Sequence, residues 1–390
     1  MVDRVGAKKC WAISSAGQAA MFALWPFIND FTGYLMMAIV FEMIGGLGGV
    51  AHGAYTIDVL PPKERVTSRA YMYSALNVGF TPGSAVGGIA LAFESITLLQ
   101  MVPWFTAAVF VVNAFRIVGL PDASHDLKTK EEKKIRIAGP GPMKNAGWLL
   151  TEFFAGTLWT NQVILNFVIP LWLVEKTDAP RVVLAFLFGT NTVMCIFLPL
   201  AAARGVKDTR VCRALIRIST VFFIVSCVIT LSTHESIGWL TIALFFVGHV
   251  TLTGAELFLS AASWTFEAEL MDPRRRGEYR GASELAGTLG RVWAPALYTF
   301  LAMNWGATGW LIIAAIVTVA AAGLHPSTKM ARAFLERHVP ADVLADATAS
   351  GPEEAAPVGP PTVEQPAEPG GVSPLSQSIG GTQPLRGNSD

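Results

Sequence analysis

The sequence predicts an all-α protein, a polytopic membrane helical bundle built from two related halves. Of its 390 residues, 52% are hydrophobic and only 15% are charged, whereas a soluble domain of this size carries about 25% charged residues. Runs of ~20 apolar residues recur along the chain, and each is long enough to cross the hydrocarbon core of a bilayer as a helix. An internal repeat adds the division into halves.

The repeat relates the stretch 42–91 to the stretch 269–295. Each contains the end of an apolar helix, a short charged turn and the start of a second helix. Five pairs of positions match without a gap: Asp58 with Glu269, Pro62 with Pro273, Arg65 with Arg276, Arg69 with Arg280, and Gly79 with Gly290. Such a register is hard to obtain by chance, so the two halves are predicted to share one design.

We expect about ten membrane spans. Lys and Arg residues concentrate at the N-terminus, in the even-numbered connections and after the last span. By the positive-inside rule, both termini are expected on the cytoplasmic side. The expected location is the plasma membrane. The expected spans lie near 9–28, 33–56, 70–93, 99–119, 147–173, 182–203, 212–232, 238–262, 281–303 and 307–324.

The composition divides the chain into four parts. Residues 1–119 form an N-terminal helical half with four spans, and residues 146–324 form a C-terminal half with six. Between them, 120–145 is charged and then rich in Gly and Pro, as in a cytoplasmic linker. Residues 325–390 form a cytoplasmic tail that is mostly disordered, because its distal part lacks large apolar residues. Short helical turns are expected near 326–338.

Several classes of function are disfavoured. The formal net charge is zero, so nothing points to nucleic acid. The four cysteines have no metal-ligand spacing and read as buried small residues. We find no nucleophile–base pair, metal cluster or P-loop, so neither an enzyme nor a cofactor is expected. The expected partners are the lipid bilayer, a small-molecule substrate and protons, and the protein is expected to be a monomer.

The third span contains a candidate hinge. Its residues Gly79, Pro82, Gly83, Gly87 and Gly88 lie within ten positions. Proline removes a backbone donor and bends a helix, and glycine makes the bend easy and the helix contact tight. Such a helix typically marks a hinge or a cavity wall.

Three motifs resemble those of the major facilitator superfamily. The stretch NVGFTPGSAVGG is similar to the antiporter motif of its proton-coupled drug exporters, although the order here is Pro82-Gly83. The opening VDRVGAKK resembles the second half of the family's loop motif G-x-L-a-D-R-x-G-R-K, with Ala7 as a departure. GVKDTRVCR echoes that loop in the second half of the chain.

The resemblance implies a twelve-helix family fold from which the first two helices are lacking. It also implies alternating access, in which two halves rock about a central cavity. Charged groups at the cytoplasmic helix ends would then form a latch that holds the halves together. Exposed ion pairs are each worth about 0–1 kcal/mol, which suits a latch that breaks in every cycle. The expected latch residues are Asp3, Arg4, Asp58, Arg65, Asp208, Arg210, Glu269, Arg276 and Arg280. Orientation by the positive-inside rule explains these charges equally well.

Glu42 stands where the family's fourth-helix motif has an arginine associated with proton coupling. A carboxyl group in an apolar span is costly when charged, so Glu42 is a candidate proton carrier; the alternative is a solvated position near the outer surface. His249, Glu256 and Glu284 are further proton-coupling candidates. A buried, satisfied imidazole is the alternative for His249.

The fifth span contains polar side chains near mid-depth. Asn161, Gln162 and Asn166 are candidates for substrate binding, with helix-to-helix hydrogen bonding as the alternative. Arg291 is the basic residue inside a span; it either contacts an anionic substrate or pairs with Glu284 or Glu256. The tryptophans that flank the fifth span, Trp148 and Trp172, are expected to be interfacial anchors.

The sequence therefore predicts a secondary active transporter of a small amphiphilic molecule, with proton-coupled efflux as in an antiporter of multidrug resistance. One alternative is an importing symporter of the same fold. Another is a truncated membrane protein that does not transport.

Overall fold

The computed structural model describes residues 2–61, 64–92, 96–122, 139–204, 206, 209–234 and 236–348. They belong to one unit, residues 1–352, and form helices with no β-strand among the described residues. The first half comprises α1 (Val2–Val5), α2 (Ala7–Leu24), η1 (Trp25–Phe27), α3 (Phe31–Val59), α4 (Arg65–Ala92) and α5 (Ile96–Val118).

The second half begins with the short helix η3 and ends with the short helix α16. Its elements are η3 (Pro142–Lys144), α7 (Ala146–Leu158), α8 (Asn161–Val163), the π-helix η4 (Ile164–Val168), α9 (Ile169–Lys176), α10 (Val183–Phe197), α11 (Pro199–Ala203), α12 (Thr209–Ser232), α13 (Trp239–Glu269), α14 (Arg276–Arg291), α15 (Ala294–His338) and α16 (Ala341–Thr348).

Each expected span falls on a helix or a short series of helices. Among the described residues, six helical segments are long and apolar enough to cross a membrane, and α10 is a shorter apolar helix. Pro199 begins a separate short helix, α11, which divides the expected span 182–203. The all-α membrane bundle predicted from the sequence is thus confirmed.

Gly306 separates the last two expected spans. Its backbone dihedrals, φ 50° and ψ −120°, are not helical, so α15 consists of two helices that meet at this residue. This conformation favours glycine. A Cβ atom on Gly309 would overlap the carbonyl oxygen of Leu301, so the backbones on the two sides of Gly306 approach closely at this point.

The predicted repeat has a structural counterpart at two helix starts. Arg65 is the first residue of α4, and its repeat partner Arg276 is the first residue of α14. Both helices follow a short turn after a long apolar helix, α3 in one half and α13 in the other. The sequence register therefore marks equivalent positions of the backbone.

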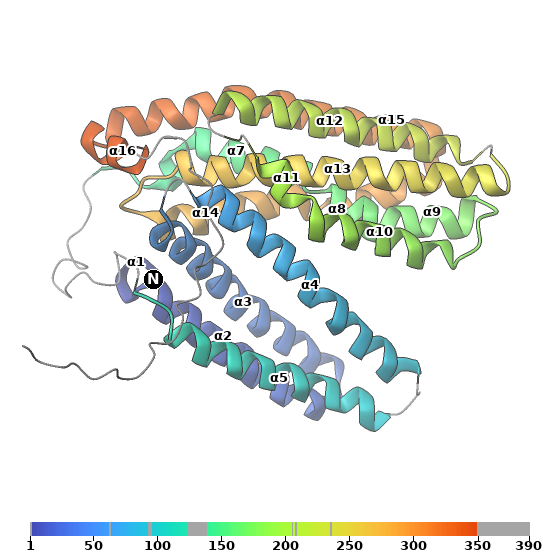
Figure 1. The fold of residues 1–390 in the computed structure, drawn as a ribbon, viewed down its shortest axis with the longest axis horizontal. Helices are drawn as coiled ribbons and strands as arrows, with labels where there is room; N and C mark the ends of the chain where they lie inside the picture. Colours follow the sequence, from blue (N-terminus) through green and yellow to red (C-terminus); the bar gives the residue numbers. More distant parts are fainter. Residues whose placement is uncertain are drawn as a thin grey trace, which may run out of the picture. The chain divides into compact units, whose positions relative to one another are not determined.

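The first half packs around α2, which lies against both α3 and α5 (Figure 1). In the second half, α7 lies against α14 and α15, and α12 lies against α13 and α15. Helix α4 packs on α10, α11 and α13, and α3 contacts α14. These contacts of α3 and α4 join the halves.

The main hydrophobic core lies in the second half and includes the fully buried side chains of Trp148, Trp172 and Trp310. The expectation that Trp148 and Trp172 are interfacial anchors is wrong. The indole Nε1 of Trp172 donates to Thr233 Oγ1 at 3.0 Å, and that of Trp148 donates to the Tyr279 carbonyl oxygen at 3.4 Å. All four cysteines are free and buried, as expected.

The described part of the expected tail is more helical than the sequence indicates. Helix α15 continues through Pro326 to His338, and α16 follows. Residues 349–390 and most of the expected linker, 123–138, lie outside the described residues.

Candidate functional site

A cavity of about 750 Å³ lies between α3, α7, α8, α13 and α14. Glu152, Ala155 and Gly156 of α7 and Trp159 at its C-terminal cap line the cavity at spacings of i, i+3, i+4 and i+7, and the lining residues of α14 from Arg280 to Arg291 follow the same pattern. This spacing places them on one face of each helix. Glu42 on α3 lines the same cavity from the first half.

Glycines form the contact between α7 and α14, two of the helices that enclose the cavity. A Cβ on Gly156 would lie 2.2 Å from the carbonyl oxygen of Gly287, and one on Gly290 would lie 2.1 Å from that of Phe153. Small residues let helix backbones approach closely in a membrane. The wall is therefore a tight backbone-to-backbone contact.

Acidic groups outnumber basic groups in the cavity lining. Four carboxylates (Glu42, Glu152, Glu267 and Glu284) face two guanidiniums, Arg280 and Arg291. Glu284 pairs with both, at 3.3 Å to Arg280 and 3.7 Å to Arg291, so the expected Glu284–Arg291 pair is present. Glu42 forms no ion pair within the part of the chain described.

Two groups of ion pairs join the halves at the ends of α3 and α4. Asp58 on α3 accepts from Arg276 on α14 at 2.8 Å, which brings two predicted latch residues together. Glu267 on α13 binds two arginines: Arg69 of α4 at 2.8 Å and Arg280 of α14. The side chains in these pairs are each at most 16% exposed, so the pairs are less screened than surface pairs.

Gly53 makes room for this network. A Cβ atom at Gly53 would lie 2.6 Å from Arg280 Nε, and the Gly53 carbonyl oxygen accepts from Arg69 Nη2 at 3.4 Å. Gly53, within the second expected span, therefore leaves room for a guanidinium from the other half.

Other predicted latch residues lie nearby or outside the described part. Arg65 donates from Nε to the Leu60 carbonyl oxygen at 3.2 Å, and Glu269 lies at the end of α13. Asp208 lies outside the described residues, and so do the side chains of Asp3, Arg4 and Arg210.

Glu256 lies buried where α4 meets α10 and α13. Its carboxylate accepts a hydrogen bond from Tyr73 Oη of α4 and one from Asn191 Nδ2 of α10 at 3.3 Å. Cys195 Sγ donates to it at 3.9 Å. The donors come from both halves, because Tyr73 lies on α4 and Asn191 and Cys195 lie on α10.

The predicted amides lie at a break in the fifth span. Asn161 and Gln162 form part of the short α8, and the π-helix η4 follows. Asn161 is buried, whereas Asn166 is exposed and donates from Nδ2 to the Gln162 carbonyl oxygen at 2.8 Å. π-Helical turns occur frequently at functional sites. Of the three amides, only Gln162 lines the cavity.

His249 and the expected hinge lie away from the cavity. His249 is buried on α13 and packs edge-on against Phe188. Helix α4 runs without interruption through Pro82. The expected tight contact is wrong for Gly79 and Gly83 as far as the described residues go, because none of them lies within 4 Å of a Cβ atom placed there. Gly87 and Gly88 lie in the same helix; their surroundings are not described.

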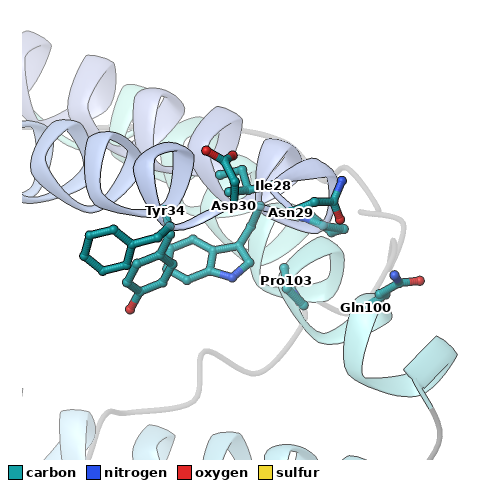
Figure 2. Close-up of a pocket in the computed structure, with 9 residues that line it drawn as sticks. Ile28, Asn29, Asp30, Tyr34, Gln100 and Pro103 are labelled. Atoms are coloured by element: carbon teal, nitrogen blue, oxygen red, sulfur yellow. The ribbon is translucent and has the colours of Figure 1, made fainter.

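A second pocket lies at the opposite end of the first half, between η1, the start of α3 and α5. Figure 2 shows the Asp30 carboxylate and the Tyr34 hydroxyl pointing in opposite directions. Asp30 caps α3 by accepting from the Gly33 backbone nitrogen at 3.2 Å. The polar groups of this second pocket do not converge on one point, so the cavity between the halves is the better candidate for the functional site.

Sequence reasoning noted Glu152 in the fifth span but assigned no role to it, and it assigned none to Glu267, Tyr73 and Asn191. Glu267 had a signal, because it lies two positions before the repeat-matched Glu269. Tyr73 and Asn191 had none, since their role depends on helices that are distant in the sequence.

Comparison with known proteins assigns the family. The sequence profile of the Major Facilitator Superfamily matches residues 1–295. A Na(+), Li(+), K(+)/H(+) antiporter of Planococcus maritimus is 26% identical over 335 residues, 80% of this chain and 78% of the relative. Multidrug resistance protein MdtH of Proteus mirabilis is 26% identical over 300 residues, 74% of this chain and 69% of the relative.

Solved structures agree on the fold. The structure of the human organic anion transporter MFSD10 matches with a TM-score of 0.61 at 15% sequence identity. The match covers 83% of this chain and 78% of the MFSD10 chain. The E. coli fucose:proton symporter matches with a TM-score of 0.57 at 15% sequence identity, and the match covers 84% of this chain and 85% of the symporter chain. Together with the profile match over most of its length, these findings show that the chain belongs to the Major Facilitator Superfamily of membrane transporters.

Proposed function

We propose that this transporter exports small, cationic, amphiphilic molecules in exchange for protons. The observation that carries the proposal is the cavity between the halves, in which carboxylates outnumber guanidiniums. The excess persists when Arg69, which reaches Glu267 from α4, is counted with the cavity. A cavity of this charge favours a cation over an anion.

The size and apolar lining of the cavity support an organic substrate. Its volume of about 750 Å³ lies within the range of ligand pockets, roughly 300–1,000 Å³. Trp159, Val163 and Pro295 line it beside the charged groups. An amphiphilic cation can place its charge near Glu42 or Glu152 and its apolar part against these side chains, where an aromatic ring adds cation–π attraction.

Glu256 supplies a route for proton coupling. Hydrogen bonds to an ionised carboxylate are about twice as strong as bonds between neutral groups. When Glu256 is ionised, its bond from Tyr73 holds α4 against α13. When Glu256 takes up a proton, this contact weakens, so protonation favours separation of α4 from α10 and α13. Glu42 remains the second proposed carrier, because it lines the cavity without an ion pair among the described residues.

The ion pairs between the halves fit the proposed latch. Asp58–Arg276 and Arg69–Glu267 hold the ends of α3 and α4 to α14 and α13. Opening that end of the cavity requires both pairs to break. We place this end in the cytoplasm, in accord with the positive-inside rule.

A second candidate is exchange of an inorganic monovalent cation for protons, as the name of the Planococcus maritimus relative states for that protein. The excess of carboxylates favours it too. The apolar part of the lining has no role in holding a small ion, which is why the organic substrate is preferred.

Transport by the full-length protein in oriented vesicles tests the proposal. Inverted vesicles with an acidic lumen should accumulate the fluorescent cation ethidium, and addition of ethidium should raise the luminal pH. Na⁺ or K⁺ should have little effect. Uptake in right-side-out vesicles instead would favour the importer, and a response to Na⁺ or K⁺ alone would favour the ion exchanger. No movement of any of these in either orientation would contradict transport by this cavity.

A further inference from the structure

A second groove, of about 610 Å³, lies between α12 and α15 and shares no lining residue with the cavity described above. On α12 its lining residues recur at helical spacing, and on α15 the small side chains Ala321 and Ala322 leave the space open. Phe266 of α13 contributes to the lining. Most of its surface is apolar, and Val221, at 56% exposed, lies on its open side.

Basic side chains gather at one end of this groove. Arg213 and Arg217 lie one turn apart on α12, and His325 faces them from α15, with 3.5 Å between Arg213 Nη1 and His325 Nδ1. Lys329, one turn further along α15, also acts on His325 electrostatically. Within the described residues no carboxylate forms an ion pair with either arginine.

The groove thus combines a cationic end with an apolar trough open to the surroundings of the helix bundle. A peptide strand would leave backbone polar groups unpaired in such a trough at membrane depth. A free anion would use the cationic end but not the trough. A molecule with an anionic head and hydrocarbon chains matches both parts by charge and polarity.

We propose that this groove binds an anionic phospholipid, with its phosphate between Arg213, Arg217 and His325 and an acyl chain along Ala321 and Ala322. Basic pockets between membrane helices on the cytoplasmic side are suited to anionic head groups. The connection before α12 is one of those in which Lys and Arg concentrate, so the positive-inside rule places the cationic end at the cytoplasmic leaflet. The site is separate from the proposed transport cavity.

Native mass spectrometry of the full-length protein in detergent, titrated with phosphatidylglycerol, tests the proposal. Arg213→Gln with Arg217→Gln should weaken binding about 30-fold, since each cationic group near a lipid surface is worth about 1 kcal/mol. The control, Arg116→Gln with Arg337→Gln, makes the same change in net charge at two other helix ends and should leave affinity unchanged. Equal losses in the two variants, or no loss in the first, would overturn the site.

A second variant tests the apolar part of the groove. Ala321→Phe keeps both arginines but fills the trough, and it should weaken phosphatidylglycerol binding by about tenfold, because buried CH₂ groups contribute ~0.8 kcal/mol each. The melting temperature without lipid should match that of the unmodified protein. Undiminished lipid binding in a folded Ala321→Phe protein, or displacement of the lipid by inorganic phosphate alone, would show that the groove holds no acyl chain.

Discussion

Arg69 and Arg280, which occupy equivalent positions in the internal repeat, bind the same carboxylate, that of Glu267. The repeat is symmetric in its arginines but not in their partner, because the position equivalent to Glu267 is Thr56. Glu267 and Arg280 belong to the same half, so separation of the halves breaks only the bond to Arg69. Glu267 therefore links the halves through Arg69 when they are in contact, and it stays paired with Arg280 when they separate.

This shared carboxylate predicts a measurable coupling between Arg69 and Glu267. A double-mutant cycle with Arg69→Gln and Glu267→Gln, read from the free energy of unfolding in detergent, should give a coupling energy of about 0.5–3 kcal/mol. The pair is largely buried, so its coupling should exceed that of the exposed Arg332–Glu336 pair, measured as the control. Strictly additive effects at Arg69 and Glu267 would rule out the link.

The Asp58–Arg276 pair predicts a charge-swap rescue. Asp58→Arg and Arg276→Asp should each reduce ethidium transport in inverted vesicles about tenfold or more, because like charges then meet across the halves. The double swap restores opposite charges, and it should recover a substantial part of the lost rate. A double variant no more active than either single one would argue that the two residues act independently.

The glycines equivalent in the repeat predict opposite responses to alanine. Gly290→Ala should lower the free energy of unfolding by about 1–3 kcal/mol, since its Cβ would overlap the Phe153 carbonyl oxygen on α7. Gly79→Ala meets no described neighbour, so it should be neutral or gain up to about 1 kcal/mol from helix propensity. Thermal unfolding of the two variants makes the comparison, and an equal loss in both would refute the difference in packing.

Glu256 predicts a change in proton coupling without loss of the fold. Glu256→Gln keeps a hydrogen-bonding side chain between Tyr73 and Asn191 but cannot take up a proton. Ethidium exchange down its own gradient should continue, whereas accumulation driven by a pH gradient should fall about tenfold or more. Glu336→Gln, on an exposed face of α15, serves as the matched control. Retained pH-driven accumulation in Glu256→Gln would remove Glu256 from the coupling mechanism.

Much of the fold was predictable because bilayer thickness and charge bias act on local sequence. The apolar runs located the helices, and the repeat marked Arg65 and Arg276, which begin α4 and α14. The burial of Trp148 was not predictable, because a tryptophan near a span end satisfies its indole N–H equally well in the interface or against Tyr279. That choice depends on a helix distant in the sequence.

The part of the site that was predictable from the sequence consists of residues whose charge or polarity is unusual for their place in a span or at a helix end. Asp58, Arg276 and Arg280 were found as charged helix ends, and Glu42, Gln162, Glu284 and Arg291 as polar groups within spans; all four of the latter line the cavity. The convergence of Tyr73, Asn191 and Cys195 on Glu256 arises from packing between α4 and α10. Nothing in the local sequence of either helix indicates that contact.

Proton release on substrate binding tests the central claim most directly. The purified protein in weakly buffered detergent solution should release protons when the cation tetraphenylphosphonium binds, as reported by a pH-indicator dye. Release should be reduced in Glu256→Gln or in Glu42→Gln, whichever carries the exchanged proton, while Glu336→Gln behaves as the unmodified protein. Binding of the cation with no proton release at any pH between about 5 and 8 would contradict exchange of a cation for protons in this cavity.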